Sequence, residues 1–209
     1  MEGLRFQLNN AAYSYSDAYI LYSMIRKYEP KRIIEIGSGF SSALMLDMKD
    51  IYANDIELSF VEPFPIQLNK LISDTDKSNA KIIQKKVQDV DISVFKALQK
   101  NDILFIDSSH VSKTGSDVNY EFFDIIPNLN SGVIIHVHDI FYPFEYPKHW
   151  VYEGRNWTEN YILRAFLSFN KNYEMLFFSD FIHKFYPEKF DNLPLMKINT
   201  GGNFWMVKK

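Results

Sequence analysis

Four acidic side chains lie at or near the ends of short apolar runs in this chain. Glu35 stands in RIIEIGSG, Glu62 ends SFVE, Asp107 ends DILFID, and Asp139 ends GVIIHVHD. Apolar runs of this length are typical of buried β-strands. In an open parallel sheet, ligands bind in the crevice outside the carboxyl ends of the strands. We therefore expect a ligand site along one edge of a parallel sheet, with these four acids beside it.

A glycine turn follows the first of these runs. The segment Arg32–Leu46 is predicted to form a strand, a turn containing Gly37 and Gly39, and a helix. The dinucleotide-binding fingerprint needs a third glycine, but Ser42 occupies that position, and Glu35 lies just before the turn. These departures argue against a nicotinamide cofactor and favour a ligand whose positive end is met by carboxylates. The alternative is a tight turn in which the glycines serve geometry alone.

Strand-like and helix-like segments alternate along the chain, which favours a parallel sheet with right-handed crossovers. After the fifth strand, Thr158 is expected to cap a helix from Glu159 to Leu167. The predicted strands are Arg32–Ile36, Leu58–Glu62, Lys81–Val87, Asp102–Asp107, Val133–His138 and an antiparallel pair, Glu174–Phe178 and Asn203–Val207. The other predicted helices are Ser14–Lys27, Ser41–Met48, Pro65–Ser73, Ile92–Leu98 and Asp117–Ile126.

The bulk composition argues against several classes of protein. The chain has 209 residues, 46% of them hydrophobic, a formal net charge of −3 and no cysteine. The absence of cysteine excludes disulfides, thiolate metal sites and a cysteine nucleophile. The net charge gives no general reason to expect nucleic-acid binding, and no apolar run approaches the ~20 residues that span a bilayer. The first residues lack the pattern of a signal peptide, so we expect a cytoplasmic protein without membrane insertion.

The motif EIGSGF, together with the acid in FVEP, resembles the class I S-adenosylmethionine-dependent methyltransferases. Their first motif is an acid, one further residue and a glycine-rich turn, and their second is an acid that ends the second strand. The resemblance implies an α/β, Rossmann-like three-layer sandwich with a mostly parallel seven-stranded sheet and an antiparallel C-terminal strand pair. We expect one domain over residues 1–209, with an N-terminal helix over about 14–28 and S-adenosylmethionine as the cofactor.

The same resemblance implies roles for particular residues. The backbone from Gly37 to Gly39 would approach the methionine portion of the cofactor, and Glu35 would hold its amino group, directly or through water. Glu62 would accept hydrogen bonds from both ribose hydroxyls, and the segment 88–89 would contact adenine. The implied cofactor-binding residues are Glu35, Gly37, Ser38, Gly39, Ser42, Glu62, Gln88, Asp89 and Asp107.

The second half of the chain carries two further motifs, IDSSH after the fourth strand and HVHD at the end of the fifth. They resemble a methyltransferase subgroup that includes sugar and polysaccharide-tailoring O-methyltransferases. This implies O-methylation of a sugar, a polysaccharide or a related small hydroxylated acceptor, within polysaccharide biosynthesis. Two alternatives are an NAD-type Rossmann oxidoreductase and a non-catalytic relative that binds the cofactor, because a fold does not guarantee an activity.

Methyl transfer to oxygen needs an acceptor in line with the methyl group and a base that takes its proton. Candidates follow the fourth and fifth strands: Asp107, His110, His138 and Asp139. We expect His110 to be the base, since histidine titrates near neutral pH, and Asp107 to orient it or the cofactor. His138 is the alternative base, whereas His136, deeper in the same strand, is expected to be a core histidine.

A divalent metal is another way to activate an acceptor hydroxyl, because a bound metal lowers the hydroxyl's pKa. Asp107 and Asp139 could bind Mg²⁺, since hard cations prefer oxygen ligands. The resemblance implies an additional acid beside Asp139, but Ile140 stands there and argues against a complete metal site.

The segment 141–157, here called the aromatic arm, combines aromatic and polar side chains. Aromatic faces beside polar groups suit sugar rings, which present both C–H faces and hydroxyls. The arm follows the fifth strand, where it could act as a lid that excludes water. A packed loop or a homodimer contact is the alternative, because these residue types are also enriched in interfaces. The aromatic residues concerned are Tyr142, Tyr146, Trp150, Tyr152 and Trp157.

Overall fold

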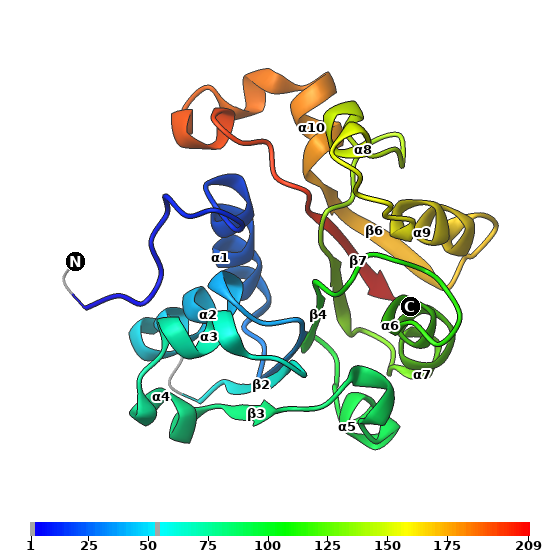
Figure 1. Cartoon of the computed structure of the whole chain (residues 1–209). Coiled ribbons are helices and arrows are strands. Elements are labelled where there is room, and N and C mark those ends of the chain that lie inside the picture. The colour runs from blue at the N-terminus through cyan, green and yellow to red at the C-terminus, as the bar shows by residue number, and fades with distance from the viewer. Residues whose placement is uncertain (1–2, 53–54) are drawn as a thin grey trace.

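A computed structural model describes residues 3–52 and 55–209 of the chain. Its strands are β1 (Arg32–Ile36), β2 (Glu57–Val61), β3 (Lys81–Ile83), β4 (Ile103–Ile106), β5 (Ile134–Val137), β6 (Tyr173–Phe178) and β7 (Phe204–Lys208). They form one seven-stranded sheet in the order β3-β2-β1-β4-β5-β7-β6 (Figure 1). β1 to β5 are parallel, whereas β7 runs antiparallel to both β5 and β6. The predicted α/β fold with an antiparallel C-terminal pair is therefore confirmed.

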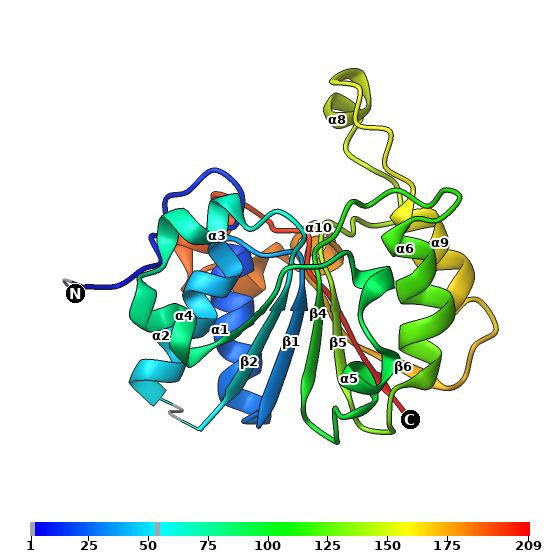
Figure 2. The ribbon, with the colours of Figure 1, turned by 60° about the horizontal axis from the view of Figure 1, so that its bottom comes forward.

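Helices cover both faces of this sheet. The α-helices of the described residues are α1 (Ser16–Tyr28), α2 (Phe40–Tyr52), α3 (Ile66–Leu71), α4 (Asp74–Asn79), α5 (Ile92–Lys96), α6 (Asp117–Tyr120), α7 (Ile126–Asn128), α8 (Lys148–Tyr152), α9 (Glu159–Leu167) and α10 (Ser179–Phe185). Figure 2 shows α1 and α2 on one side of the strands and α5, α6 and α9 on the other, which gives the three layers. In the described part of the chain, no helix has the length and apolar character needed to cross a membrane.

Two hydrophobic clusters fill the spaces between the layers. Along β4, Ile103 and Phe105 pack toward the cluster of α1 and α2, while Leu104 and Ile106 pack toward the cluster of α5 and α9. All four side chains are fully buried. A central parallel strand is covered on both faces, so its sequence is a continuous apolar run instead of an alternating one. This explains why ILFI and IIHV identify the two central strands β4 and β5.

Several elements differ from the sequence-based expectation. The helix predicted to run to Ser73 ends at Leu71, because Ser73 caps α4 in a reciprocal pair with Asp76. The helix predicted over Asp117–Ile126 is interrupted by a π-helical turn, Glu121–Ile125, before α7. The structure also contains α8 inside the aromatic arm and α10 after β6, neither of which was predicted.

Backbone hydrogen bonds align the carboxyl ends of the central strands in one row. The residue that follows each strand donates its N–H to the neighbouring strand: Glu62 to Ile83 (3.1 Å), Gly37 to Val61 (3.0 Å), Asp107 to Ile36 (2.9 Å) and His138 to Ile106 (2.9 Å). The parallel pairing therefore brings the predicted acids and histidines, which are far apart in sequence, to one edge of the sheet.

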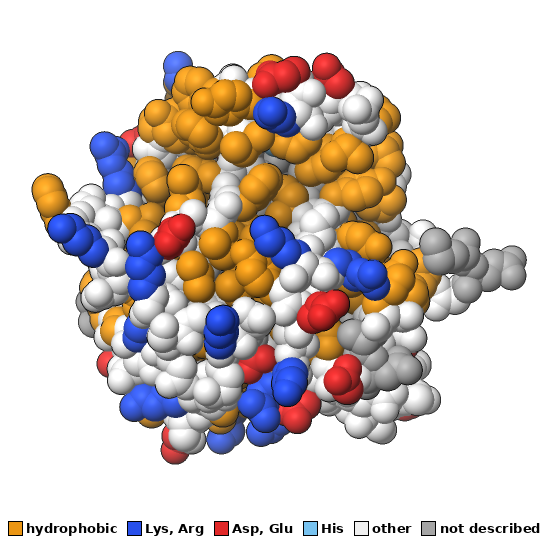
Figure 3. Space-filling model, turned by 180° about the vertical axis from the view of Figure 1, so that it is seen from behind, with side chains coloured by type: hydrophobic (Ala, Val, Ile, Leu, Met, Phe, Trp, Pro, Cys, Tyr) orange, Lys and Arg blue, Asp and Glu red, His pale blue; other side chains and the backbone are white. Residues whose placement is uncertain are grey.

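One face of the molecule exposes a group of hydrophobic side chains. Figure 3 shows them on the side opposite to the view of Figure 1, over the region of β6, α10 and the segment that follows α10. Exposed residues from these elements include Met175, Phe185, Tyr186 and Ile198. A second copy of the chain could cover such a face. The homodimer stays a prediction.

The turn after β1 offers a test of how tightly its backbone is packed. Gly37 has a φ of +82°, and a Cβ added there would overlap the carbonyl oxygen of Asp107. We expect Gly37→Ala to lower the free energy of unfolding by about 3 kcal/mol or more, since it adds overpacking to left-handed strain. Gly115→Ala is the matched control, because Gly115 has a φ of +69° but no atom near the added Cβ. It should cost only about 1–2 kcal/mol in urea unfolding; equal losses in the two variants would contradict a steric role for Gly37.

Candidate active site

Two adjoining clefts lie along the carboxyl edge of β1, β2 and β4. The larger has a volume of about 600 Å³ and the smaller about 330 Å³. Three residues line both clefts: Gly37, Glu62 and Asp107. Gln88 lines the larger cleft, whereas Ser38 and Gly39 line the smaller one. Six of the predicted cofactor-binding residues are thus brought together at one surface.

The groups at this surface fit the cofactor that the sequence implies. The carboxylate of Glu62 accepts hydrogen bonds from the backbone N–H groups of Ser38 (3.3 Å) and Phe64 (2.8 Å), which fix its direction beside the glycine turn. The Oγ atom of Ser38 is buried but has no hydrogen-bond partner among the described residues. A buried polar atom without a partner is costly, so a ligand with polar groups would satisfy it. An acidic acceptor, a free hydroxyl and a close-packed glycine backbone together suit S-adenosylmethionine.

Three other predicted cofactor residues lie outside the lining of the clefts. Glu35 is fully buried beneath the turn, and its two carboxylate oxygens accept hydrogen bonds from the hydroxyls of Ser41 and Ser42. Burial raises the pKa of Glu35 to about 8, despite these hydrogen bonds. The Ser42 hydroxyl also accepts the N–H of Gly39 at 3.0 Å, so this group braces the turn from below. Asp89 belongs to a short 3-10 turn near the larger cleft, and the cofactor roles of all three residues stay predictions.

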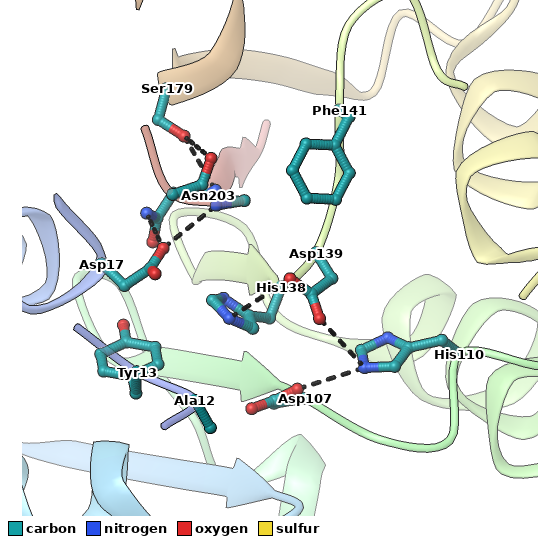
Figure 4. Close-up of polar contacts among 12 residues, drawn as sticks. Ala12, Tyr13, Asp17, Asp107, His110, His138, Asp139, Phe141, Ser179 and Asn203 are labelled. Atoms are coloured by element: carbon teal, nitrogen blue, oxygen red, sulfur yellow. Dashed lines mark hydrogen bonds and ion pairs between the residues drawn. The ribbon is translucent and has the colours of Figure 1, made fainter. Parts of the chain in front are cut away.

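A second group of polar side chains meets next to the clefts, after β4 and β5. His110 Nε2 lies 3.4 Å from Asp107 Oδ1 and 3.7 Å from Asp139 Oδ2 (Figure 4). His110 and Asp139 both adopt left-handed backbone conformations, with φ values of +58° and +56°. Such conformations cost free energy in residues other than glycine and concentrate at functional sites. The structure thus brings together three residues that the sequence predicted for catalysis or metal binding.

The charges in this cluster stabilise one another. Burial alone would raise the pKa of Asp107, but the neighbouring His138 and the hydrogen bond from His110 outweigh it and lower that pKa to about 2. Burial alone would lower the pKa of His110, but its hydrogen bonds with Asp107 and Glu159 raise it well above the usual value. Asp107 is therefore an anion, and the carboxylates around His110 strongly favour its protonated form.

His138 and His136 share one strand face but differ in their surroundings. His138 Nε2 lies 3.7 Å from Asp139 Oδ1, and although burial opposes it, the nearby Asp107 and Asp139 raise the pKa of His138. His136 stacks on Phe105 with ring centroids 4.1 Å apart, and burial lowers its pKa well below the usual value. His136 is thus a neutral histidine packed in the core, whereas His138 faces the acidic cluster.

Two residues of the site were not predicted from the sequence. Glu159 is fully buried, and its Oε2 atom lies 2.8 Å from His110 Nδ1. In the sequence, Glu159 stands directly after Thr158, where an acid is explained by the helix dipole alone. Tyr13 lines the smaller cleft, and its ring lies 5.1 Å from that of His138. Nothing in the sequence around Tyr13 indicates this position.

The aromatic arm is divided between the active site and the solvent. The Trp157 ring lies 4.2 Å from the His110 ring, and Arg155 lies 4.1 Å from the centre of the Trp150 ring. Tyr142 instead packs on α10, and Tyr152 is 78% exposed in α8, which projects away from the sheet (Figure 2). The arm therefore reaches the acidic cluster through Trp157, while its tip is free to contact other molecules. A role as a lid stays a prediction.

Comparisons with known proteins agree with this geometry. The family described as "Methyltransferase domain" matches residues 34–140, which run from the middle of β1 to just past β5 and include Glu62, Asp107, His110 and Asp139. A protein of Archaeoglobus fulgidus described as uncharacterized is 41% identical over 97 residues. That alignment covers 46% of this chain and 43% of the relative, so the chain matches less than half of the relative's length.

Solved structures share the fold at low sequence identity. The O-methyltransferase TomG of Streptomyces achromogenes, solved in complex with SAM, matches with a TM-score of 0.60 and 14% identity, over 96% of this chain and 83% of TomG. The Podospora anserina methyltransferase PaMTH1, bound to SAH, matches with a TM-score of 0.55 and 17% identity, over 92% of this chain and 77% of PaMTH1. These findings do not favour the alternative of a Rossmann oxidoreductase. Because the family match covers more than half of the residues, the chain belongs to the methyltransferase domain family, and it shares its fold with these solved methyltransferases.

Proposed function

We propose that this chain transfers a methyl group from S-adenosylmethionine to a hydroxyl of a sugar, a polysaccharide or a related small hydroxylated acceptor. The observation that carries this proposal is the position of Asp107. Its side chain lines both clefts beside Gly37 and Glu62, and it also pairs with His110 in the acidic cluster. One residue thus connects the proposed donor site with the proposed proton-accepting site.

The larger and smaller clefts would hold the donor. When bound, S-adenosylmethionine supplies an electrophilic methyl group on a positively charged sulfur. Glu62 would accept hydrogen bonds from the ribose hydroxyls, Ser38 and Gly39 would lie along the methionine portion, and Gln88 would lie near adenine. Carboxylates at this edge, including Asp107, suit a ligand that carries positive charge.

The acidic cluster would handle the acceptor's proton. His110 in its neutral form is the proposed base, because its Nε2 atom faces Asp107 and Asp139 at the edge of the cleft. The same carboxylates raise the pKa of His110, so the neutral form that can take a proton becomes more populated as the pH rises. These carboxylates stabilise the imidazolium that forms when His110 takes a proton from the acceptor hydroxyl. His138, which contacts the other oxygen of Asp139, is the alternative base.

The acceptor class rests on the resemblance of IDSSH and HVHD to sugar-modifying methyltransferases and on the aromatic arm. Trp150 and Trp157 form an edge-to-face pair beside His110, with ring centroids 5.1 Å apart. Aromatic faces next to hydrogen-bonding groups are suited to sugar rings. A glycan acceptor would therefore bind under the arm, and we expect the reaction to take place in the cytoplasm within polysaccharide biosynthesis.

A metal-dependent version of the same reaction has one specific observation in its favour. One ligand atom each from Asp107, His110 and Asp139 all lie within 4.8 Å of one another. One solved structure of this fold, described as cmcI-D160 Mg-SAM, names magnesium beside SAM; it is 13% identical to this chain, with a TM-score of 0.54. In this version Asp107 and Asp139 would hold Mg²⁺, which would lower the pKa of the acceptor hydroxyl.

The donor site is tested by calorimetry with S-adenosylhomocysteine and with NAD. We expect the wild type to bind S-adenosylhomocysteine, and Glu62→Ala to weaken this binding by about 1–3 kcal/mol, because it removes the acceptor for the ribose hydroxyls. Glu57→Ala, at the other end of β2 and away from the clefts, is the control and should bind normally. Binding of NAD alone would contradict the proposed function.

The base is tested by replacing His110. We expect His110→Gln to lower kcat by about 100-fold or more, the usual contribution of a general base, with little change in the affinity for S-adenosylhomocysteine. Turnover is measured with labelled S-adenosylmethionine and a panel of sugar acceptors. His183→Gln, in α10, is the matched control and should keep wild-type turnover. Wild-type turnover in His110→Gln, together with its loss in His138→Gln, would transfer the role to His138.

Metal dependence is tested by assaying turnover after treatment with EDTA. If His110 takes the proton directly, turnover persists without added metal, because no step then depends on a cation. Loss of turnover that Mg²⁺ restores, and that Asp139→Asn makes insensitive to Mg²⁺, would instead support the metal-dependent version.

A further inference from the structure

The second ring nitrogen of His110 points away from the cleft and into the protein. There, His110 Nδ1 lies 2.8 Å from Glu159 Oε2, at the first residue of α9. Glu159 is fully buried, and its other oxygen has no hydrogen-bond partner among the described residues. A buried carboxylate is costly unless it is paired, so its one strong contact, the imidazole of His110, must compensate for much of its burial.

The backbones of the two residues are also locked together. The carbonyl oxygen of His110 accepts the N–H groups of Thr158 (2.8 Å) and Glu159 (3.2 Å). The Thr158 hydroxyl accepts the N–H of Ser112 at 2.7 Å instead of capping its own helix. The start of α9 is therefore attached to the loop of His110 by three hydrogen bonds in addition to the side-chain contact. This attachment explains how His110 can keep its left-handed conformation.

Residues before and after Glu159 also restrain the surroundings of His110. Trp157 packs its ring against the His110 imidazole, as described above. Asn160 accepts the N–H of Phe141 at 3.1 Å and donates its own N–H to the Tyr146 hydroxyl at 3.1 Å. The segment Trp157–Asn160 thus joins the His110 loop to the aromatic arm, and it leaves His110 little freedom to rotate.

A second buried acid, Glu121, supports the assignment of Glu159 as the partner of His110. Glu121 is fully buried in the π-helical turn, where it accepts the hydroxyl of Ser108 at 3.1 Å, and both burial and the nearby Glu159 raise its pKa. Two acids buried this close repel each other when both are charged. If the start of α9 had only a structural role, it would not need Glu159 so close to Glu121. A role in orienting His110 accounts for the presence of Glu159.

We propose that Glu159 is a positioning residue that accepts the Nδ1–H of His110 and thereby directs His110 Nε2 toward Asp107 and Asp139. A carboxylate in this place fixes the tautomer and the orientation of the imidazole, as a third group does in other histidine-dependent sites. The consequence for turnover rests on the proposed function, in which His110 Nε2 serves the acceptor. The geometry at Nδ1 does not depend on that function.

The proposal is tested by NMR of the full chain with ¹⁵N-labelled histidine. We expect a downfield Nδ1–H proton for His110 in the wild type, because the proton is shared with a carboxylate. Glu159→Ala should abolish this signal, and Glu159→Gln should shift it upfield, since the side chain keeps its size but loses its charge. Asp102→Asn is the matched control, because Asp102 is a buried carboxylate with backbone partners at the opposite edge of the sheet. It should leave the signal in place.

Kinetic measurements distinguish a role of Glu159 in positioning His110 from a role in packing alone. We expect Glu159→Gln to lower kcat per folded molecule by at least about 10-fold while KM for S-adenosylmethionine changes little, and Asp102→Asn to keep the wild-type kcat per folded molecule. A His110 signal that is unchanged in Glu159→Ala, or a Glu159→Gln variant with wild-type kcat, would overturn the proposal. The NMR result decides it even if the wild type methylates no tested acceptor, an outcome that would contradict only the proposed function.

Discussion

The parallel pairing of β1 with β4 fixes the backbone of Asp107, and both halves of the site depend on that position. The N–H of Asp107 bonds to Ile36, and its carbonyl group lies against Gly37, where a side chain would not fit. The Asp107 carboxylate consequently stands at the border of the two clefts and within reach of His110. In the proposed function, the methyl donor and the proton acceptor must lie close together, and this contact between strands would bring their sites together.

Burial of charge is the second constraint, and it makes the active-site residues interdependent. Asp107, Asp139 and Glu159 surround His110, and the positive charge of its protonated imidazole compensates for three carboxylates close together, of which Glu159 is fully buried. The low pKa of Asp107 and the raised pKa of His110 have the same physical origin, namely an ion pair with limited access to water. Such a cluster favours a cation nearby, whether it is the sulfonium of the donor or a metal ion.

The start of α9 connects this cluster to the aromatic arm. Trp157 and Glu159 contact the two sides of His110, and Asn160 holds the arm at Phe141 and Tyr146. Whatever binds under the arm would therefore meet side chains whose positions are tied to His110. This is a physical route by which acceptor binding and the orientation of the proposed base are linked, although the two lie in different segments of the sequence.

The sequence by itself determined the elements whose signal is local. A continuous apolar run identifies a strand that is covered on both faces, so β1 was predicted with its observed bounds, and the bounds of β4 and β5 were predicted to within one residue at each end. The helix over Glu159–Leu167 was also predicted with its observed bounds, although Thr158 uses its hydroxyl elsewhere. The family resemblance followed from EIGSGF and FVEP for the same reason, because the residues of those motifs are adjacent in the chain.

Only the tertiary structure decided which side chains meet. Glu159 lies 49 positions after His110, and in the sequence it cannot be distinguished from an ordinary acid at the start of a helix. Glu35 is predicted from its motif to bind the cofactor, but only the structure shows that its carboxylate lies beneath the turn, where it contacts Ser41 and Ser42. Side-chain partners of this kind depend on loop paths and strand register, which are set by packing over the whole chain and leave no pattern in the local sequence.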